Sequence, residues 1–181
     1  MCSSDLSVTA DFFVSNGPGS FQGLPVTFAE RLAALPELSA VSPFRATVAQ
    51  VNGETKTLGA VNGAAFGQLV DIDLQSGSVE SLDEGRILLH RDPARDYGVG
   101  VGDTLTVLWQ NGTTQQLEVG GVYADATIAG NWLIGLSTLE QVSTAEPTDF
   151  FISAKIADGV SVEDARAAVE KVATDFPKIG R

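Results

Sequence analysis

The sequence predicts an α+β fold, in which a split βαβ (ferredoxin-like) lobe carries an inserted, mostly β lobe. One observation behind this is a repeat: residues 11–15 (DFFVS) are echoed by residues 149–153 (DFFIS). Each copy reads as a strand followed by a helix, which predicts two related β–α units in one sheet. The chain between the copies is rich in strand and turn signals. We therefore assign residues 1–62 plus 148–181 to the split lobe and residues 63–147 to the insertion.

The composition is that of a folded domain. The chain has 181 residues, of which 44% are hydrophobic and 19% charged, and it can therefore bury a core. With 23 Asp and Glu against 11 Lys and Arg, the net charge is −12, which repels phosphate backbones and anionic lipid headgroups. We therefore expect no nucleic-acid partner. Cys2 is the only cysteine, which excludes an internal disulfide and leaves open whether Cys2 is lipidated.

The first elements follow from local composition. Residues 6–15 are rich in β-branched and aromatic side chains and predict a strand. The Gly- and Pro-containing residues 16–20 predict a loop. Residues 26–35 predict a helix, because Phe28 and Leu32 lie on one helical face.

Two Asn-Gly dipeptides predict β-hairpins, because both positions of a two-residue hairpin turn require positive φ. Asn52-Gly53 separates strand-like residues 44–51 and 54–61. Asn111-Gly112 separates residues 104–110 and 113–119. The two hairpins therefore belong to the β-rich part of the fold.

The remaining elements are shorter. We expect helices at residues 64–70 and 139–142, and strands at 86–90, 132–136 and 150–156. The last helix has the clearest signal, since Ser161 and Asp164 have the spacing of a capping box and an apolar stripe runs to Phe176. Of the two tryptophans, Trp132 is expected in the core, while Trp109 fits either the core or an exposed contact.

No enzyme signature emerges from the reactive residues. His90 is the only histidine, and the chain contains no Gly-x-Ser-x-Gly motif, so a strand-end or surface role for His90 is favoured over catalysis. The Gly-rich residues 97–103 precede a predicted strand rather than the helix that a phosphate loop requires. We therefore expect no catalytic residue and no nucleotide or other cofactor.

Metal binding is likewise not expected. Asp71 and Asp73 form one acidic group, and Asp92 and Asp96 form another. Neither has the regular ligand spacing and following glycine of a calcium loop. A solvated acidic loop is the favoured interpretation of both.

The order of several motifs resembles that in the extracytoplasmic domains of MacB/FtsX-family ABC-transporter permeases. Residues 32–43 (LAALPELSAVSP) resemble the family's helix, Leu-Pro and Val-Ser-Pro passage. Residues 82–89 (LDEGRILL), 101–105 (VGDTL) and 117–123 (LEVGGVY) follow in the family's order. The resemblance covers nearly the whole chain.

This resemblance implies a non-catalytic domain on the extracytoplasmic face of a bacterial cell membrane, tethered by transmembrane helices outside this sequence. It implies a homodimeric permease and a cytoplasmic ATPase partner, which carries the Walker motifs. ATP-driven movement would act on an extracytoplasmic protein, a peptide or a lipophilic substrate, in efflux, lipoprotein release or signalling. The alternative is a free-standing secreted binding or adhesion protein with the same two-lobe architecture.

Partner contact is expected far from the two termini, on the inserted lobe. The candidates are Asn111 and Gly112 in the second hairpin, and Asp125 and Asn131 at the ends of a loop between strands. Both segments are polar or glycine-bearing, and binding residues often lie on such loops. The competing interpretation is that they merely connect strands.

Overall fold

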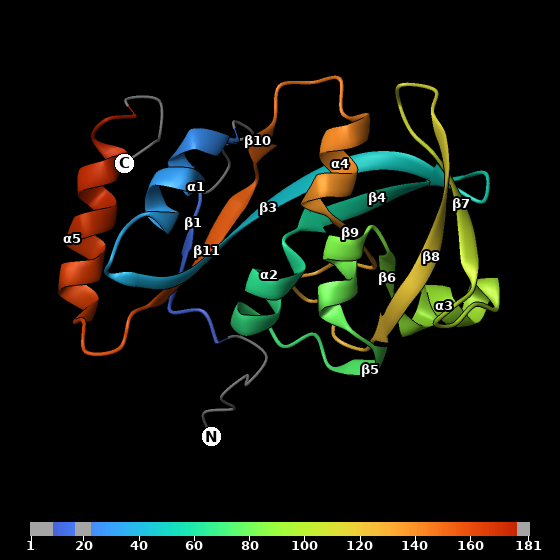
Figure 1. The fold of residues 1–181 in the computed structure, drawn as a ribbon, viewed down its shortest axis with the longest axis horizontal. Coiled ribbons are helices and arrows are strands. Elements are labelled where there is room, and N and C mark those ends of the chain that lie inside the picture. The colour runs from blue at the N-terminus through green and yellow to red at the C-terminus, as the bar shows by residue number, and fades with distance from the viewer. Residues whose placement is uncertain (1–8, 17–22, 177–181) are drawn as a thin grey trace.

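The computed structural model describes residues 9–16 and 23–176 (Figure 1). Cys2, the first part of the predicted strand at 6–15 and most of the predicted loop at 16–20 lie outside the described residues. Among the described residues, no helix is both long and apolar enough to cross a membrane.

A split βαβ unit forms one end of the molecule. β1 (Phe12–Val14) and β3 (Leu38–Val51) both pair antiparallel to β11 (Phe151–Ile156), so β1 and β3 run parallel with β11 between them. α1 (Val26–Ala33) connects the two parallel strands. The predicted fold class is therefore confirmed, and the strands that carry the two Phe-Phe pairs lie side by side.

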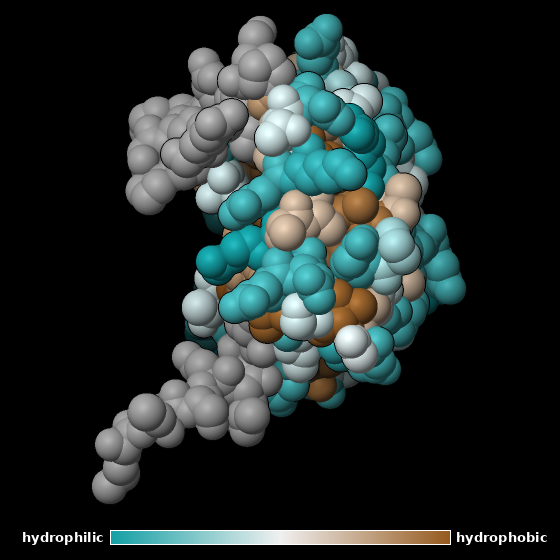
Figure 2. Space-filling model, turned by 90° about the vertical axis from the view of Figure 1, so that its left-hand side faces the viewer, coloured by the Kyte–Doolittle hydropathy of each residue, from teal (hydrophilic) through white to brown (hydrophobic). Residues whose placement is uncertain are grey.

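α1 and α5 (Val162–Ala173) pack together on one face of this unit. Their shared core includes Phe28, Leu32, Ile152, Ala154, Ala165 and Val172. Figure 2 views the molecule from the side on which α5 lies, where hydrophilic side chains predominate. Ser161 caps α5 as predicted, because its hydroxyl oxygen accepts a hydrogen bond from the Asp164 N–H at 3.1 Å.

Each Phe-Phe pair places one ring inward and one outward. Phe12 packs against the core beneath α1 and α5, while Phe13 is 44% exposed. Phe151 stacks on Phe44 with ring centroids 4.6 Å apart, while Phe150 is 65% exposed. The alternation of side chains along a strand accounts for the first pair, whereas Phe150 lies in the bend between β10 and β11.

The same sheet continues through the rest of the chain. Its strand order is β1-β11-β3-β4-β9-β6-β8-β5, and β7 pairs with both β3 and β8. The further strands are β4 (Glu54–Val61), β5 (Leu74–Gly77), β6 (Ile87–His90), β7 (Thr104–Leu108), β8 (Thr114–Tyr123) and β9 (Trp132–Gly135). A separate short pair joins β2 (Leu24–Pro25) and β10 (Thr148–Asp149). The helices of this region are α2 (Gly63–Leu69), the 3₁₀ helix η1 (Val79–Glu84), α3 (Arg91–Tyr97) and α4 (Leu136–Val142).

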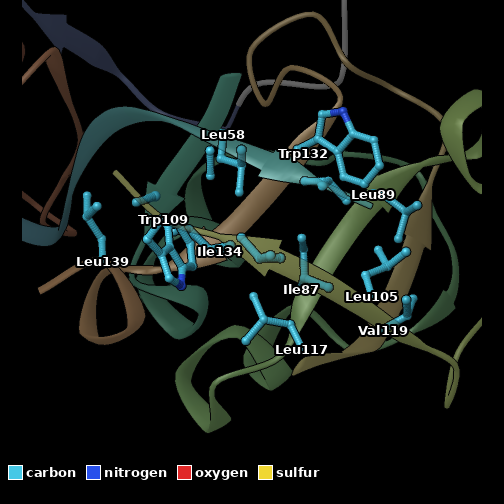
Figure 3. Packing of buried hydrophobic residues seen from close by; sticks show 14 of the residues in the cluster. Leu58, Ile87, Leu89, Leu105, Trp109, Leu117, Val119, Trp132, Ile134 and Leu139 are labelled. Atoms are coloured by element: carbon cyan, nitrogen blue, oxygen red, sulfur yellow. The ribbon is translucent and has the colours of Figure 1, made fainter. Parts of the chain in front are cut away.

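The β-rich region has a core of its own, in which aliphatic side chains surround two tryptophans (Figure 3). Trp132 is 4% exposed, as expected for a core residue. Trp109 is 3% exposed, and its indole N–H donates to Gln115 Oε1 at 2.9 Å. Of the two alternatives for Trp109, the structure therefore selects the core.

β3 begins six positions earlier than the predicted residue 44, at Leu38. Pro43 lies inside the strand, opposite Ile152 of β11. A proline is tolerated there because its missing N–H points away from β11, and pairing with β4 begins only at Arg45. The sequence analysis placed the start of this strand at Phe44, directly after Pro43.

The two Asn-Gly hairpins are present but use different turns. Asn52 and Gly53 have φ values of 48° and 87°, which fits the expected two-residue turn. In the second hairpin only Gly112 has positive φ, at 83°, and the strands end at Leu108 and resume at Thr114. The second connection is therefore longer than predicted.

Candidate partner-contact surfaces

The connection between β7 and β8 forms an exposed tip closed by its own backbone. Asn111 and Gly112 are both exposed. The Trp109 N–H donates to the Thr113 carbonyl at 2.8 Å, and the Gly112 N–H donates to the Trp109 carbonyl at 3.0 Å. Asn111 Oδ1 accepts from the Thr113 N–H at 2.9 Å. These hydrogen bonds all lie within the hairpin, so the polar atoms of the tip are oriented without help from the rest of the protein.

This hairpin tip, residues 110–113, is attached to buried and hydrogen-bonded parts of the protein. Trp109 directly before it is buried in the core, and β7 is bonded to β3 as well as to β8. Figure 1 shows β7 and β8 at the opposite end of the long axis from α5 and β1. The tip is therefore exposed, far from the described ends of the chain, and attached to the sheet through two strands.

The loop of residues 125–131 is held by the rest of the molecule. The Asp125 N–H donates to the Ile72 carbonyl at 2.9 Å, and the Asn131 carbonyl accepts from the His90 N–H at 2.9 Å. The Tyr123 hydroxyl donates to the Gly130 carbonyl at 2.6 Å. Burial raises the pKa of Tyr123 well above its ordinary value, so this hydroxyl keeps its proton and remains a donor.

Part of this tethered loop is itself core. Ala129 is 1% exposed, and Ala126 and Ile128 pack against the same apolar cluster. Asp125 is half-buried, whereas Asn131 is exposed. The side chains that remain available to a partner are therefore fewer than the sequence of the loop suggests.

The four candidate residues do not form one surface. Asn111 and Gly112 precede β8, and Asp125 and Asn131 follow it. β8 has 10 residues, which places the hairpin tip and the tethered loop about 30 Å apart at the ordinary strand rise. A partner that reached both would have to span the length of this strand.

His90 ends β6, as predicted, but its side chain is buried rather than free for chemistry. Its Nδ1 accepts from the Asp92 N–H at 3.3 Å and so caps α3. Its Nε2 lies 3.0 Å from the Ala124 carbonyl, which fits the tautomer with a proton on Nε2. Both ring nitrogens are thereby used in holding α3 and the segment after β8.

The two acidic groups differ in structure. Asp71 Oδ1 accepts from the Asp73 N–H at 2.9 Å in an exposed turn, where Asp73 has a φ of 51°. Asp92 and Asp96 belong to α3, so a loop was the wrong interpretation for this pair. Within the described residues, no group of three or more His, Cys, Asp or Glu side chains could hold a metal ion.

A buried ion pair was missed by the sequence analysis. Arg45 of β3 donates from Nε to Asp149 Oδ1 at 2.7 Å and from Nη1 to Glu140 Oε1 at 3.1 Å. Asp149 has no exposed surface, and burial raises its pKa although the Arg45 guanidinium opposes this. Arg45 and Asp149 are 104 positions apart, so no local pattern could have indicated the pair.

The fold defines an α+β domain in which a split βαβ unit is continued by a β-rich region. The family model of the MacB-like periplasmic core domain matches residues 3–172, and the chain belongs to that family. The family identifies the chain as an extracytoplasmic domain of transporter type. No curated protein matches the sequence.

Solved structures show the same fold at low sequence identity. The periplasmic region of MacB from Actinobacillus actinomycetemcomitans superposes with a TM-score of 0.66 at 19% identity, covering 92% of this chain and 83% of that one. The extracellular domain of the noncanonic ABC-type transporter YknZ from Gram-positive bacteria superposes with a TM-score of 0.62 at 13% identity. The match covers 91% of this chain and 93% of that one. A domain of a permease-like protein from Porphyromonas gingivalis superposes with a TM-score of 0.58 at 18% identity. The match covers 84% of this chain and 76% of that one.

Proposed function

We propose that this domain belongs to a permease and transmits movement from a cytoplasmic ATPase partner to a substrate or partner outside the membrane. The observation that carries the proposal is the family match over residues 3–172, with a fold shared with periplasmic and extracellular transporter domains. In this role the domain is non-catalytic and is tethered by transmembrane helices, and the permease works as a homodimer. Its cargo is an extracytoplasmic protein, a peptide or a lipophilic molecule.

In this proposal, residues 1–62 plus 148–181 form the lobe near the membrane, and residues 63–147 form the lobe that meets the partner. The hairpin tip with Asn111 and Gly112 is the main contact, because it is exposed and far from α5 and β1. Asp125 and Asn131 belong to a second, lesser surface, because hydrogen bonds and buried side chains hold their loop.

A sheet suits such a role. The hairpin tip is joined to β3 through β7, and β3 is joined to β11 and so to β1. Because these strands are hydrogen-bonded to one another in one sheet, a displacement of the split βαβ unit would also displace the tip. The same continuity would carry a signal in the opposite direction.

The test is a distance measurement on the full-length permease with its ATPase. A spin label at Asn111→Cys, with Cys2→Ser to remove the other thiol of this sequence, reports the separation of the two tips in the dimer. We expect the distribution to shift by several ångströms between the nucleotide-free and the ATP-trapped states. The control is an ATPase partner unable to bind ATP, for which no shift is expected. Equal distributions in both states would contradict the proposed movement.

A further inference from the structure

One edge of β3 is interrupted. Along this edge, β3 pairs with β11 from Leu38 to Phe44 and with β7 at Gln50 and Val51. Among the described residues, no strand pairs with residues 45–49 on the same edge, although β4 pairs with them on the other. A gap of five residues, residues 45–49, corresponds to about 17 Å of strand.

The turn between β3 and β4 determines which backbone groups face this gap. A two-residue turn at Asn52 and Gly53 makes Val51 and Glu54 the closing hydrogen-bonded pair. In an antiparallel ladder such pairs alternate. Every second residue back from Val51 is therefore bonded to β4, and the residues between them point their N–H and C=O groups to the opposite edge.

Bonds at the two ends of the gap agree with this phase. The Phe44 carbonyl accepts from the Phe150 N–H at 2.6 Å at one end, and the Asn52 N–H donates to the Thr106 carbonyl of β7 at 2.8 Å at the other. Ala46 and Val48 have the same phase and lie between them. Their two N–H and two C=O groups thus face the gap, where no described strand is paired with them, although β10 lies beside β3.

A cleft of about 300 Å³ lies along this edge. Its first wall is β3 itself, including Ala46 and Val48, and its second is α4 with residues 143–148. Trp109 and Gln110, directly after β7, close one end. Val48 is 38% exposed, so the cleft offers an apolar side chain beside the unpaired backbone groups. An extended peptide presents the donors and acceptors that such an edge lacks.

The charges of the cleft favour a cationic ligand. Glu140 and Glu146 line it, and the Glu140 side chain is 60% exposed. Arg45 is the only cation among its lining residues, and it is buried and already bound to Glu140 and Asp149. The accessible charge is therefore negative, which also disfavours a second copy of this chain with its net charge of −12.

We propose that the edge of β3 at Ala46 and Val48 binds an extended segment of a partner protein that carries Lys or Arg, as an added β-strand. The segment lies antiparallel to β3, in line with β11 and β7. Its backbone bonds to Ala46 and Val48, and its basic side chains lie near Glu140 and Glu146. This site adjoins the hairpin tip at Gln110, but it does not depend on the function proposed for the tip.

The test uses the 181-residue chain and a capped peptide, acetyl-Thr-Lys-Val-Lys-Val-Thr-amide, as the probe. Titration is followed by amide NMR and hydrogen exchange. We expect the amide resonances of Ala46 and Val48 to shift and their protons to exchange with solvent more slowly. The Kd of the peptide should be at or below about 1 mM. A peptide with Glu in place of both Lys should bind at least tenfold more weakly.

Val48→Pro is the decisive variant. It removes an N–H that faces the gap and leaves the ladder to β4 intact, because the N–H of Val48 does not point to β4. We expect at least a tenfold loss of peptide binding, while the matched control Val48→Thr, which keeps the N–H, should bind like the wild type. If Val48→Pro does not fold, peptides N-methylated at alternate amides, in both phases, test the same bonds from the ligand side. At least one phase should then abolish binding to the wild-type protein.

Several results would overturn the proposal. These are the absence of amide shifts at about 1 mM peptide, equal affinity of the Lys and Glu peptides, wild-type binding by Val48→Pro, or full binding by both methylated peptides. Self-association of the peptide-free chain that is lost in Val48→Pro would assign the edge to a second copy instead.

Discussion

The two loops at the ends of β8 both contain polar residues and a glycine, but they have opposite structural roles. The hairpin tip contains Gly112 and the tethered loop contains Gly130, each with positive φ, at 83° and 69°. The described hydrogen bonds of the tip stay within its own hairpin. Those of the tethered loop reach Ile72, Tyr123 and His90. A glycine-bearing loop can therefore be a free contact surface or a closure of the core, and here the apolar residues Ala126, Ile128 and Ala129 distinguish the tethered loop from the tip.

The largest expected difference between the loops comes from a charge placed in each. Ala129→Asp puts a carboxylate into an apolar cluster at a position 1% exposed, and we expect it to lower the free energy of unfolding by about 3–5 kcal/mol. Asn111→Asp in the exposed hairpin tip is the matched change, expected to stay within about 0.5 kcal/mol. Urea denaturation of both variants measures this. Equal losses would mean that the tip is also part of the core.

A smaller effect is expected when one hydrogen bond of the tethered loop is removed. Tyr123→Phe leaves the Gly130 carbonyl without its donor, which should cost about 1–3 kcal/mol in the free energy of unfolding. Tyr97→Phe is the matched control, because the Tyr97 hydroxyl donates to Glu54 in an exposed contact, and it should change stability by less than about 0.5 kcal/mol. If the two variants have the same free energy of unfolding, the Tyr123–Gly130 hydrogen bond does not stabilise the loop.

The smallest difference is expected for the two glycines. An added Cβ would meet nothing within 4 Å at Gly112 or at Gly130, so alanine at either position bears only the strain of a left-handed backbone. We expect Gly112→Ala and Gly130→Ala each to lower the free energy of unfolding by about 1 kcal/mol. Thermal denaturation of the pair provides the comparison. A much larger loss at Gly130 would show that the tethered loop cannot relax around the change.

Much of the fold could be predicted from local signals. The Phe-Phe repeat predicted the neighbouring strands β1 and β11, the Ser161 cap predicted the start of α5, and the Asn52-Gly53 turn predicted the β3–β4 hairpin. The cap and the turn depend on residues close together in the sequence, and the repeat compares two short segments from opposite ends of the chain. They could therefore be recognised without knowledge of the tertiary structure.

Predictions failed where a local rule was overridden. The strand predicted from residue 44 begins earlier, at Leu38, and Pro43 is accommodated within it because it lies where its missing N–H is not needed. The helix α3 was not predicted, because Asp92 and Asp96 were interpreted as an acidic loop; Pro93 is tolerated in its first turn. The first error concerns where a strand begins and the second is a missed helix, and neither affected the fold class.

The candidate surfaces were harder to predict than the fold. The sequence indicated polar loops but could not reveal the Asp125–Ile72 and Tyr123–Gly130 hydrogen bonds that hold one of them. It also gave no sign of the Arg45–Asp149 pair. The Asp125–Ile72 and Arg45–Asp149 contacts depend on which segments the folded sheet brings together, and that is not encoded in a short window.

The most direct test of the account compares the two loops for function in the full-length permease. Asn111→Lys alters the hairpin tip, and Thr127→Lys, at an exposed position of the tethered loop, is the matched control. Transport or signalling is measured together with permease abundance and the ATPase activity of the partner. We expect Asn111→Lys to reduce transport or signalling at least tenfold at unchanged abundance and ATPase activity, and Thr127→Lys to remain near wild type. Wild-type function of Asn111→Lys, or an equal loss in both variants, would contradict the role proposed for the hairpin tip.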